Sequence, residues 1–215
     1  MIIKINLNIF LFALLFFITS QFEIYTLVML FALFHELGHL LCGIIMGFEV
    51  ENLKIMPLGF SVEFKPKIID YNKKVLKSNS LTLKKILINI AGPFVNVVII
   101  LVACLMNLNQ NIIYSNLIIL IVNLIPIYPL DGGRILKNIL KLLVGNKKAY
   151  KYTNIISNIF VIIIGFVFSI AIYYYKNIAI FFAIIFILVL ILNENKRYNT
   201  YKKIYKIIDN NEDYI

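Results

Sequence analysis

The sequence predicts an all-α polytopic membrane protein, with about six transmembrane helices and a short membrane-associated β-hairpin after the second helix. Three observations support this fold class. Of the 215 residues, 61% are hydrophobic, which is more apolar surface than a soluble domain of this length can bury. Apolar segments of membrane length recur along the chain, with basic residues between them. One of the intervening segments alternates in polarity, as paired strands do.

Six apolar segments follow one another, and each predicts one span. They are about 5–19, 24–47, 86–106, 112–130, 154–175 and 178–192. The first and the last are short, so we expect them to be thin or tilted into the interface. Lys4 precedes the first segment and no small-residue cleavage site follows it, which favours a retained span over a signal peptide.

The spans predict a single transmembrane domain at 1–192. Its core lies at about 24–135, a helical hairpin follows at 154–192, and residues 193–215 form a short polar cytoplasmic tail. The two spans of the helical hairpin contain no charged side chain. We therefore expect them to serve packing and anchoring.

The distribution of charge predicts the orientation. The chain has 21 lysines and arginines and a net charge of +10, and every basic residue except Lys176 falls on one side of the six-span topology. By the positive-inside rule, both termini and the long loops at 48–85 and 131–153 are cytoplasmic, in what we expect is a bacterial cell membrane. Because the basic residues lie between apolar spans, we expect them to contact anionic lipid and expect no nucleic-acid partner.

The loop after the second span carries a pattern typical of strands. Glu51, Leu53 and Ile55 before Pro57-Leu58-Gly59, and Phe60, Val62 and Phe64 after it, alternate with polar residues. This period of two predicts a β-hairpin with one apolar face, near the mouth of a site. Such a hairpin can receive a substrate strand by edge pairing, or it can be a structural cap on the bundle. The pattern leaves both interpretations open.

The second span contains three polar side chains at membrane depth. His35 and His39 are four residues apart, so they share one helical face on which two imidazoles can chelate a metal ion. Glu36, beside the first histidine, is placed to take a proton from an attacking water. Polar groups within a span are costly and usually mark function. The alternative is that they are buried polar groups that pair with one another or with a neighbouring helix.

The fourth span ends in a broken segment, NLIPIYPLDGGR at 123–134. Its two prolines prevent a regular helix, and irregular backbone at membrane depth must be buried in protein or line a cavity. Gly132 and Gly133 give backbone freedom directly after the break.

Asp131 lies in this segment and is the candidate third ligand. Because the second and fourth spans run in the same direction, His39 and Asp131 approach the same half of the membrane. Two histidines and a carboxylate leave a fourth position for water at a catalytic zinc site, although the same set can hold iron or cobalt. The alternative role for Asp131 is as the N-cap of an amphipathic helix at 134–144.

Two asparagines of the third span, Asn89 and Asn96, are expected to form hydrogen bonds between helices as packing groups. Cys42 and Cys104 both lie inside apolar spans. We therefore expect no structural disulfide, and Cys42 is best explained as a small core residue.

The motifs HELGH, AGPFVN and NLIPIYPLDGGR resemble those of the site-2 protease family of intramembrane zinc metalloproteases. Their order is most similar to the stage IV sporulation protease branch, which activates a sigma-factor precursor. The resemblance covers about residues 30–135 and implies one zinc ion per chain. It implies that the zinc ligands are His35, His39 and Asp131, that the catalytic base is Glu36, and that Asn123 and Pro126 bind substrate. A PDZ domain and a CBS domain, found in parts of this family, are not expected here.

The resemblance implies a metalloendopeptidase that cleaves a membrane-embedded or membrane-associated protein, in a regulatory step such as transcription-factor activation in sporulation. The expected partners are this protein substrate, the lipid bilayer and membrane-bound regulators. Two other classes of function stay open. Intramembrane histidine and acidic residues also mark ion paths in transporters and channels, and a family member without catalysis would act as a membrane scaffold.

Overall fold

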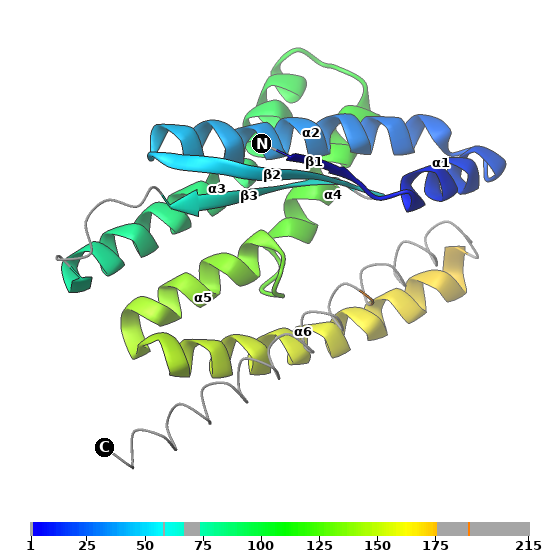
Figure 1. The fold of residues 1–215 in the computed structure, drawn as a ribbon. Helices are drawn as coiled ribbons and strands as arrows, with labels where there is room; N and C mark the ends of the chain where they lie inside the picture. Colours follow the sequence, from blue (N-terminus) through cyan, green and yellow to red (C-terminus); the bar gives the residue numbers. More distant parts are fainter. Residues whose placement is uncertain (1, 58, 67–73, 176–188, 190–215) are drawn as a thin grey trace.

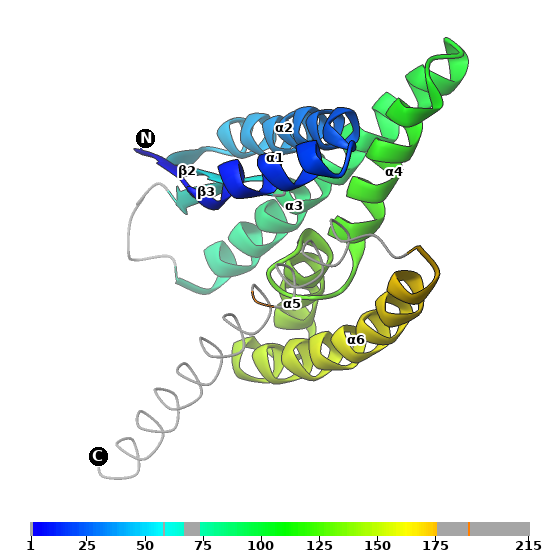
Figure 2. The same ribbon diagram turned by 90° about the vertical axis from the view of Figure 1, so that its right-hand side faces the viewer.

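The computed structural model describes residues 2–57, 59–66, 74–175 and 189. Its elements in chain order are β1 (Ile2–Ile5), α1 (Asn8–Ile18), α2 (Phe22–Ile45), β2 (Phe48–Met56), β3 (Gly59–Pro66), α3 (Lys74–Leu105), α4 (Gln110–Leu124), α5 (Asp131–Val144) and α6 (Asn146–Tyr175). The fold is mostly helical. The strands lie along α2, whereas α6 lies on the opposite side of the molecule from α2 (Figures 1 and 2). Between them, α3 contacts both α2 and α5.

Three of the described helices are long and apolar enough to cross a membrane, at Phe22–Ile45, Asn79–Leu105 and Asn146–Val167. α1 and α4 are apolar but shorter. The described part of the chain therefore contains three candidate spans, and the predicted number of six is not confirmed. The first predicted span begins within β1, and α4, which lies in the fourth predicted span, ends at Leu124. The sixth segment, at 178–192, and the polar tail at 193–215 fall, apart from residue 189, outside the described residues.

The predicted β-hairpin is confirmed. β2 and β3 pair antiparallel, and the chain reverses between Met56 and Gly59, as the sequence pattern predicts. The register shifts between Val50 and Asn52, which leaves Glu51 at a bulge instead of in the predicted alternation. A bulge adds one residue to one strand, so it changes which neighbours share a face.

The sequence pattern does not predict β1, because residues 2–5 continue into the apolar run of the first segment. β1 pairs in parallel with β2, and the sheet has the order β1-β2-β3. The fold is mostly helical as predicted, but β1 adds a third strand to the predicted two-stranded hairpin. β3 is left as an edge strand, with one side of its backbone not paired to another described strand.

The hairpin extends along almost the whole of α2. Near the start of α2, the Tyr25 hydroxyl donates a 3.0 Å hydrogen bond to the Pro57 carbonyl. Near its end, a Cβ on Gly43 would lie 2.3 Å from the Phe64 ring, so this position has no room for a larger residue. The 9 residues of β2 extend about 31 Å, close to the length of about 36 Å for α2. The hairpin therefore lies at the depth of a helix that can cross the membrane.

The chain between α4 and α5 is irregular, as its prolines predict. Ser157 of α6 holds this segment: its hydroxyl accepts a 3.1 Å hydrogen bond from the Tyr128 amide and donates a 3.3 Å bond to the Pro126 carbonyl. A Cβ on Gly132 or Gly133 would lie 2.2 or 2.4 Å from the preceding backbone. These glycines therefore permit close packing of the first turn of α5, and the backbone freedom expected from the sequence is not their main role.

Candidate metal centre

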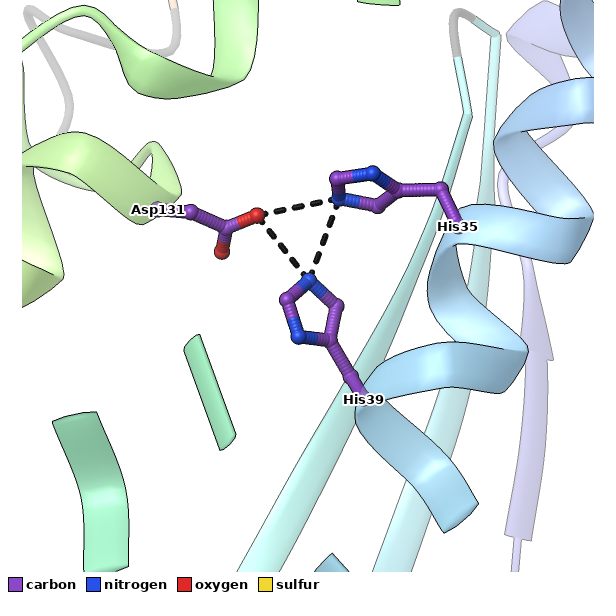
Figure 3. Close-up of side chains that lie close together, drawn as sticks. All are labelled: His35, His39 and Asp131. Carbon is purple, nitrogen blue, oxygen red and sulfur yellow. Dashed lines mark hydrogen bonds and ion pairs between the residues drawn. The ribbon is translucent and has the colours of Figure 1, made fainter. Parts of the chain in front are cut away.

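α2 presents three buried polar side chains. His35, Glu36 and His39 are 4%, 8% and 4% exposed, respectively. As their spacing predicts, the two imidazoles lie on one helical face, and their Nε2 atoms are 3.1 Å apart. Both Nε2 atoms are directed toward the start of α5 (Figure 3).

Asp131 reaches the two histidines from α5. Its Oδ2 lies 3.0 Å from His35 Nε2 and 2.9 Å from His39 Nε2, as Figure 3 shows. The N-cap of α5 is Leu130, and Asp131 is in the first helical turn. The alternative role of Asp131 as the N-cap is therefore wrong, although its carboxylate is favoured by the helix dipole at this end. The three side chains form a buried group that can hold a metal ion.

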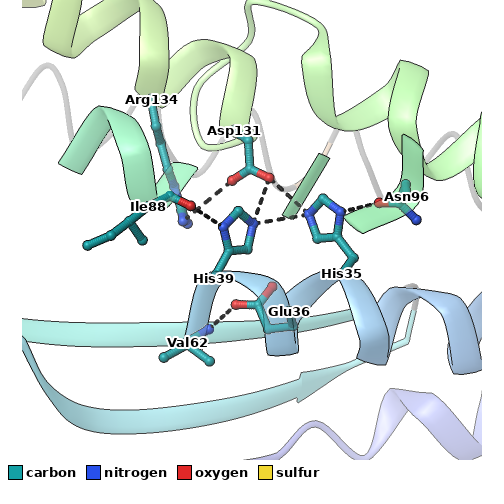
Figure 4. Close-up of polar contacts among 8 residues, drawn as sticks. All are labelled: His35, Glu36, His39, Val62, Ile88, Asn96, Asp131 and Arg134. Carbon is teal, nitrogen blue, oxygen red and sulfur yellow. Dashed lines mark hydrogen bonds and ion pairs between the residues drawn. The ribbon is translucent and has the colours of Figure 1, made fainter. Parts of the chain in front are cut away.

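The second ring nitrogen of each histidine, Nδ1, forms a hydrogen bond with an acceptor on α3. Nδ1 of His35 donates to Asn96 Oδ1, and Nδ1 of His39 donates a 2.7 Å hydrogen bond to the Ile88 carbonyl (Figure 4). With the proton on Nδ1, each neutral ring presents its Nε2 lone pair to the cluster. A carbonyl or amide behind a ligating histidine commonly sets its tautomer and ring orientation.

Asn96 has more than the packing role expected from the sequence. Its Nδ2 donates a 2.9 Å hydrogen bond to Asn116 Oδ1 of α4, so it does join two helices, while its Oδ1 contacts His35. Both asparagines are 0% exposed. The pattern around Asn96 carries no signal for the second contact, because His35 lies 61 residues away.

Gly92 forms one side of the cluster. A Cβ at this position would lie 2.3 Å from His39 Nε2 and 2.7 Å from His35 Nε2. A glycine here therefore keeps the space in front of both ligand nitrogens open. Spacing alone does not reveal this role, since Gly92 is on a different helix from the histidines.

The donor set fits zinc. Its donor atoms are 2.9–3.1 Å apart, close to the separation of about 3.3 Å between ligands of a tetrahedral zinc ion. A bound cation would favour the ionised form of the Asp131 carboxyl, which is the form that ligates a metal. The identity of the metal stays a prediction.

Glu36 contacts the sheet. Its Oε1 accepts a hydrogen bond from the Val62 amide on the edge of β3 (Figure 4). This bond fixes the carboxylate between α2 and the hairpin, beside the two histidines. On the other side of the cluster, a guanidinium nitrogen of Arg134 lies 3.9 Å from Asp131 Oδ1. The sequence patterns identified neither Val62 nor Arg134 as part of the site.

The two predicted substrate-binding residues lie near the cluster in sequence but are not joined to it. Asn123 is in the last turn of α4, and Pro126 follows in the irregular segment. Within the described residues, neither forms a hydrogen bond with the histidines or with Asp131. The Pro126 carbonyl instead accepts a hydrogen bond from the Ser157 hydroxyl of α6. Their role in substrate binding stays a prediction.

Asn96→Ala is expected to lower zinc affinity by about 10- to 100-fold, because it removes the acceptor that orients His35. A competition titration with a chromogenic chelator measures this affinity in the detergent-purified protein. Asn111→Ala, at the start of α4, is the control and should bind zinc like the wild type. Equal affinity in the two variants would mean that Asn96 serves helix packing alone.

Comparison with known proteins identifies the class. The model of peptidase family M50 matches residues 23–114 and 103–167, which together make up more than half of the chain. The protein therefore belongs to peptidase family M50, the membrane-embedded site-2 protease family.

Individual relatives agree with this family. Stage IV sporulation protein FB of Bacillus subtilis is 29% identical over 146 residues, covering 63% of this chain and 47% of that protein. A zinc metalloprotease of Methanocaldococcus jannaschii is 32% identical over 128 residues, covering 54% of this chain and 34% of that protein. The chain thus spans less than half the length of these relatives. The solved site-2 protease from Methanocaldococcus jannaschii shares the fold, with a TM-score of 0.62 at 24% identity over 86% of both chains.

Proposed function

We propose that this protein is an intramembrane zinc metalloprotease that hydrolyses a peptide bond of a membrane-embedded or membrane-associated protein. The observation that carries the proposal is the buried cluster of His35, His39 and Asp131, whose ligand atoms all lie within 4.8 Å of one another. Glu36 follows His35 directly in the chain. These donor types, with a neighbouring carboxylate, are the parts that zinc peptidases use. Membership of peptidase family M50 supports the same chemistry.

Each residue then has a distinct task. His35, His39 and Asp131 would hold the zinc, which when bound acts as a Lewis acid toward the scissile carbonyl and lowers the pKa of water. Glu36 keeps Oε1 on the Val62 amide, accepts a proton from the attacking water at its other oxygen, and passes it to the leaving amine. Asn96 and the Ile88 carbonyl hold the imidazoles in the orientation that directs Nε2 into the cluster.

In the cell, we infer a multi-pass protein of the bacterial membrane with both termini and its long loops in the cytoplasm. The positions of the basic residues support this orientation. We infer that the cleavage is a regulatory step, such as activation of a transcription-factor precursor in sporulation. The similarity to stage IV sporulation protein FB supports that role. A substrate must be locally extended to be cut. The edge of β3 beside Glu36, which pairs with no other described strand, can pair with such a segment.

Zinc analysis of wild type and Asp131→Ala tests the proposal. In detergent, the wild type is expected to contain about one zinc ion per chain and the variant almost none, because zinc loses its only anionic ligand. Only the zinc-loaded wild type should cleave a fluorescent casein probe, and chelation should stop the cleavage until zinc is restored. Glu49→Ala, which changes an exposed acid on β2, is the control and should behave like wild type.

The opposite results separate the alternatives. A folded wild type without metal would leave His35 and His39 as polar packing residues. Zinc that binds and enters liposomes in a His35-dependent manner, without any proteolysis, would favour a transporter. Zinc binding without proteolysis or flux would favour a scaffold.

A further inference from the structure

A cleft of about 480 Å³ lies beside the metal centre, and its lining includes Val62, Ile88 and Arg134. Three residues of its lining each contact a different residue of the site. The Val62 amide donates to Glu36, the Ile88 carbonyl accepts from His39, and the Arg134 guanidinium lies 3.9 Å from Asp131. Figure 4 shows these three contacts around the cluster. A peptide bond positioned for cleavage would therefore have its flanking residues in this cleft.

The two walls of the cleft differ in character. One wall is the edge of β3, with Val62 and Phe64. Strand residues two apart direct their amides to the same edge, so the Val62 contact with Glu36 shows that this edge faces the site. The other wall comes from α3 and α5, which contribute Lys85, Arg134 and Lys137. An extended peptide can therefore meet backbone groups on one side and cations on the other.

The cations of the second wall are close enough to repel one another. Lys85 of α3 lies within electrostatic reach of Lys137 and Lys141 of α5. Lys85 has no ion-pair partner within 4.0 Å in the described part of the chain. The Lys137 ammonium is held over the rings of Tyr128 and Tyr150, at 4.6 and 3.7 Å from their centroids. These contacts fix the position of the ammonium group in the helical wall.

The two acidic residues of the lining, Glu51 and Glu63, belong to the sheet, whereas the lysines come from the helices. Glu63 accepts a hydrogen bond from Asn52 with one oxygen and contacts Lys54 with the other, and both partners lie in the sheet. Glu51 is an exposed residue at the bulge of β2. An anion placed between the walls would be attracted to the lysines of the helical wall.

We propose that this cleft binds an acidic side chain of the substrate and so sets the sequence preference of the enzyme. Lys85 is one helical turn from Ile88, and Phe64 is two strand residues from Val62. At a rise of about 3.3 Å per extended residue, the acidic residue would lie about two to four positions from the cleaved bond. This inference rests on the proposed protease function and names the chemistry of the substrate that the same site accepts.

Cleavage-site profiling tests the inference. The probe is a mixture of peptides released by trypsin from bacterial membranes, incubated in detergent with the zinc-loaded protein and read by mass spectrometry. Aspartate and glutamate are expected to be enriched about fivefold within four residues of the cut, the size expected for a partly exposed charge pair. Lys85→Glu should abolish this enrichment, and Lys85→Gln should reduce it. Lys151→Glu, the same charge change on an exposed position of α6, should preserve it.

The outcomes distinguish this inference from the function on which it rests. Zinc-dependent cleavage without acidic enrichment, or enrichment that survives Lys85→Glu in a variant with wild-type zinc content, would overturn the inference alone. Absence of any cleavage beyond that of Glu36→Gln would overturn the protease function and the inference together. A preference that is lost in phosphatidylglycerol vesicles would assign the cleft to an anionic lipid headgroup, against the proposal.

Discussion

Glu36→Gln is expected to lower peptide-bond cleavage by about 10²- to 10⁴-fold, the usual contribution of a general base, while zinc content stays at the wild-type level. The substitution is close to isosteric, and the amide oxygen of glutamine can still accept the Val62 hydrogen bond that Glu36 accepts now. Glutamine cannot take a proton from water, however, so the chemical step loses its base. The side chain is not one of the three candidate ligands, which is why metal binding should persist.

Two measurements on the same preparation decide this prediction: zinc per chain, and the rate of casein-probe cleavage. Glu23→Gln, an exposed acid in the first turn of the same helix, should leave both quantities unchanged. Cleavage that survives Glu36→Gln would remove Glu36 from the mechanism. Loss of zinc along with activity would instead make Glu36 a ligand or an essential support of the ligands.

Gly92→Ala is expected to reduce zinc affinity by about 100-fold or more, at the upper end of the effects seen when ligand orientation is disturbed. The added Cβ would lie 2.3 Å from His39 Nε2 and 2.7 Å from His35 Nε2, so it would displace both ligand nitrogens. Relief through movement of α3 is restricted, because this helix also supplies the Asn96 and Ile88 acceptors that hold the two rings. Loss of zinc should eliminate cleavage as well.

The affinity titration described for Asn96→Ala measures this effect, and thermal unfolding in detergent reports whether the variant folds. Gly165→Ala on α6 is the matched control, because a Cβ at Gly165 would have nothing within 4 Å. It should bind zinc normally and be stabilised slightly, by up to about 1 kcal/mol, through higher helix propensity. Normal zinc affinity in Gly92→Ala would show that the cluster can shift to accept a methyl group and that Gly92 is not needed for an open site.

Much of the fold follows from local patterns. The apolar run around His35 and His39 predicts a long helix with both rings on one face, and the structure has that helix at Phe22–Ile45. The alternation on either side of Pro57 predicts the hairpin, because strand residues two apart must share a face. Such patterns depend only on the period of the element, so they are visible in the sequence itself.

Only the tertiary structure decides the contacts between distant elements. β1 joins the sheet through pairing with β2, and nothing in its apolar residues distinguishes that strand from the start of a helix. The bulge at Glu51 likewise depends on how two strands are aligned. Asn96 contacts His35, and Gly92 closely approaches both rings. Both contacts require one particular position of α3 along the axis of α2. Local periodicity carries no information on this relative position, because side-chain packing between the two helices determines it.

The sequence by itself thus determined which residue types could ligate a metal and which helix carries two of them. The tertiary structure decided that the third candidate, Asp131, lies 3.0 and 2.9 Å from those two. It also placed Val62 and Arg134 beside the site and formed the cleft with its lysines. The physical reason is that a cluster of side chains from separate helices exists only once those helices have buried their apolar faces against one another.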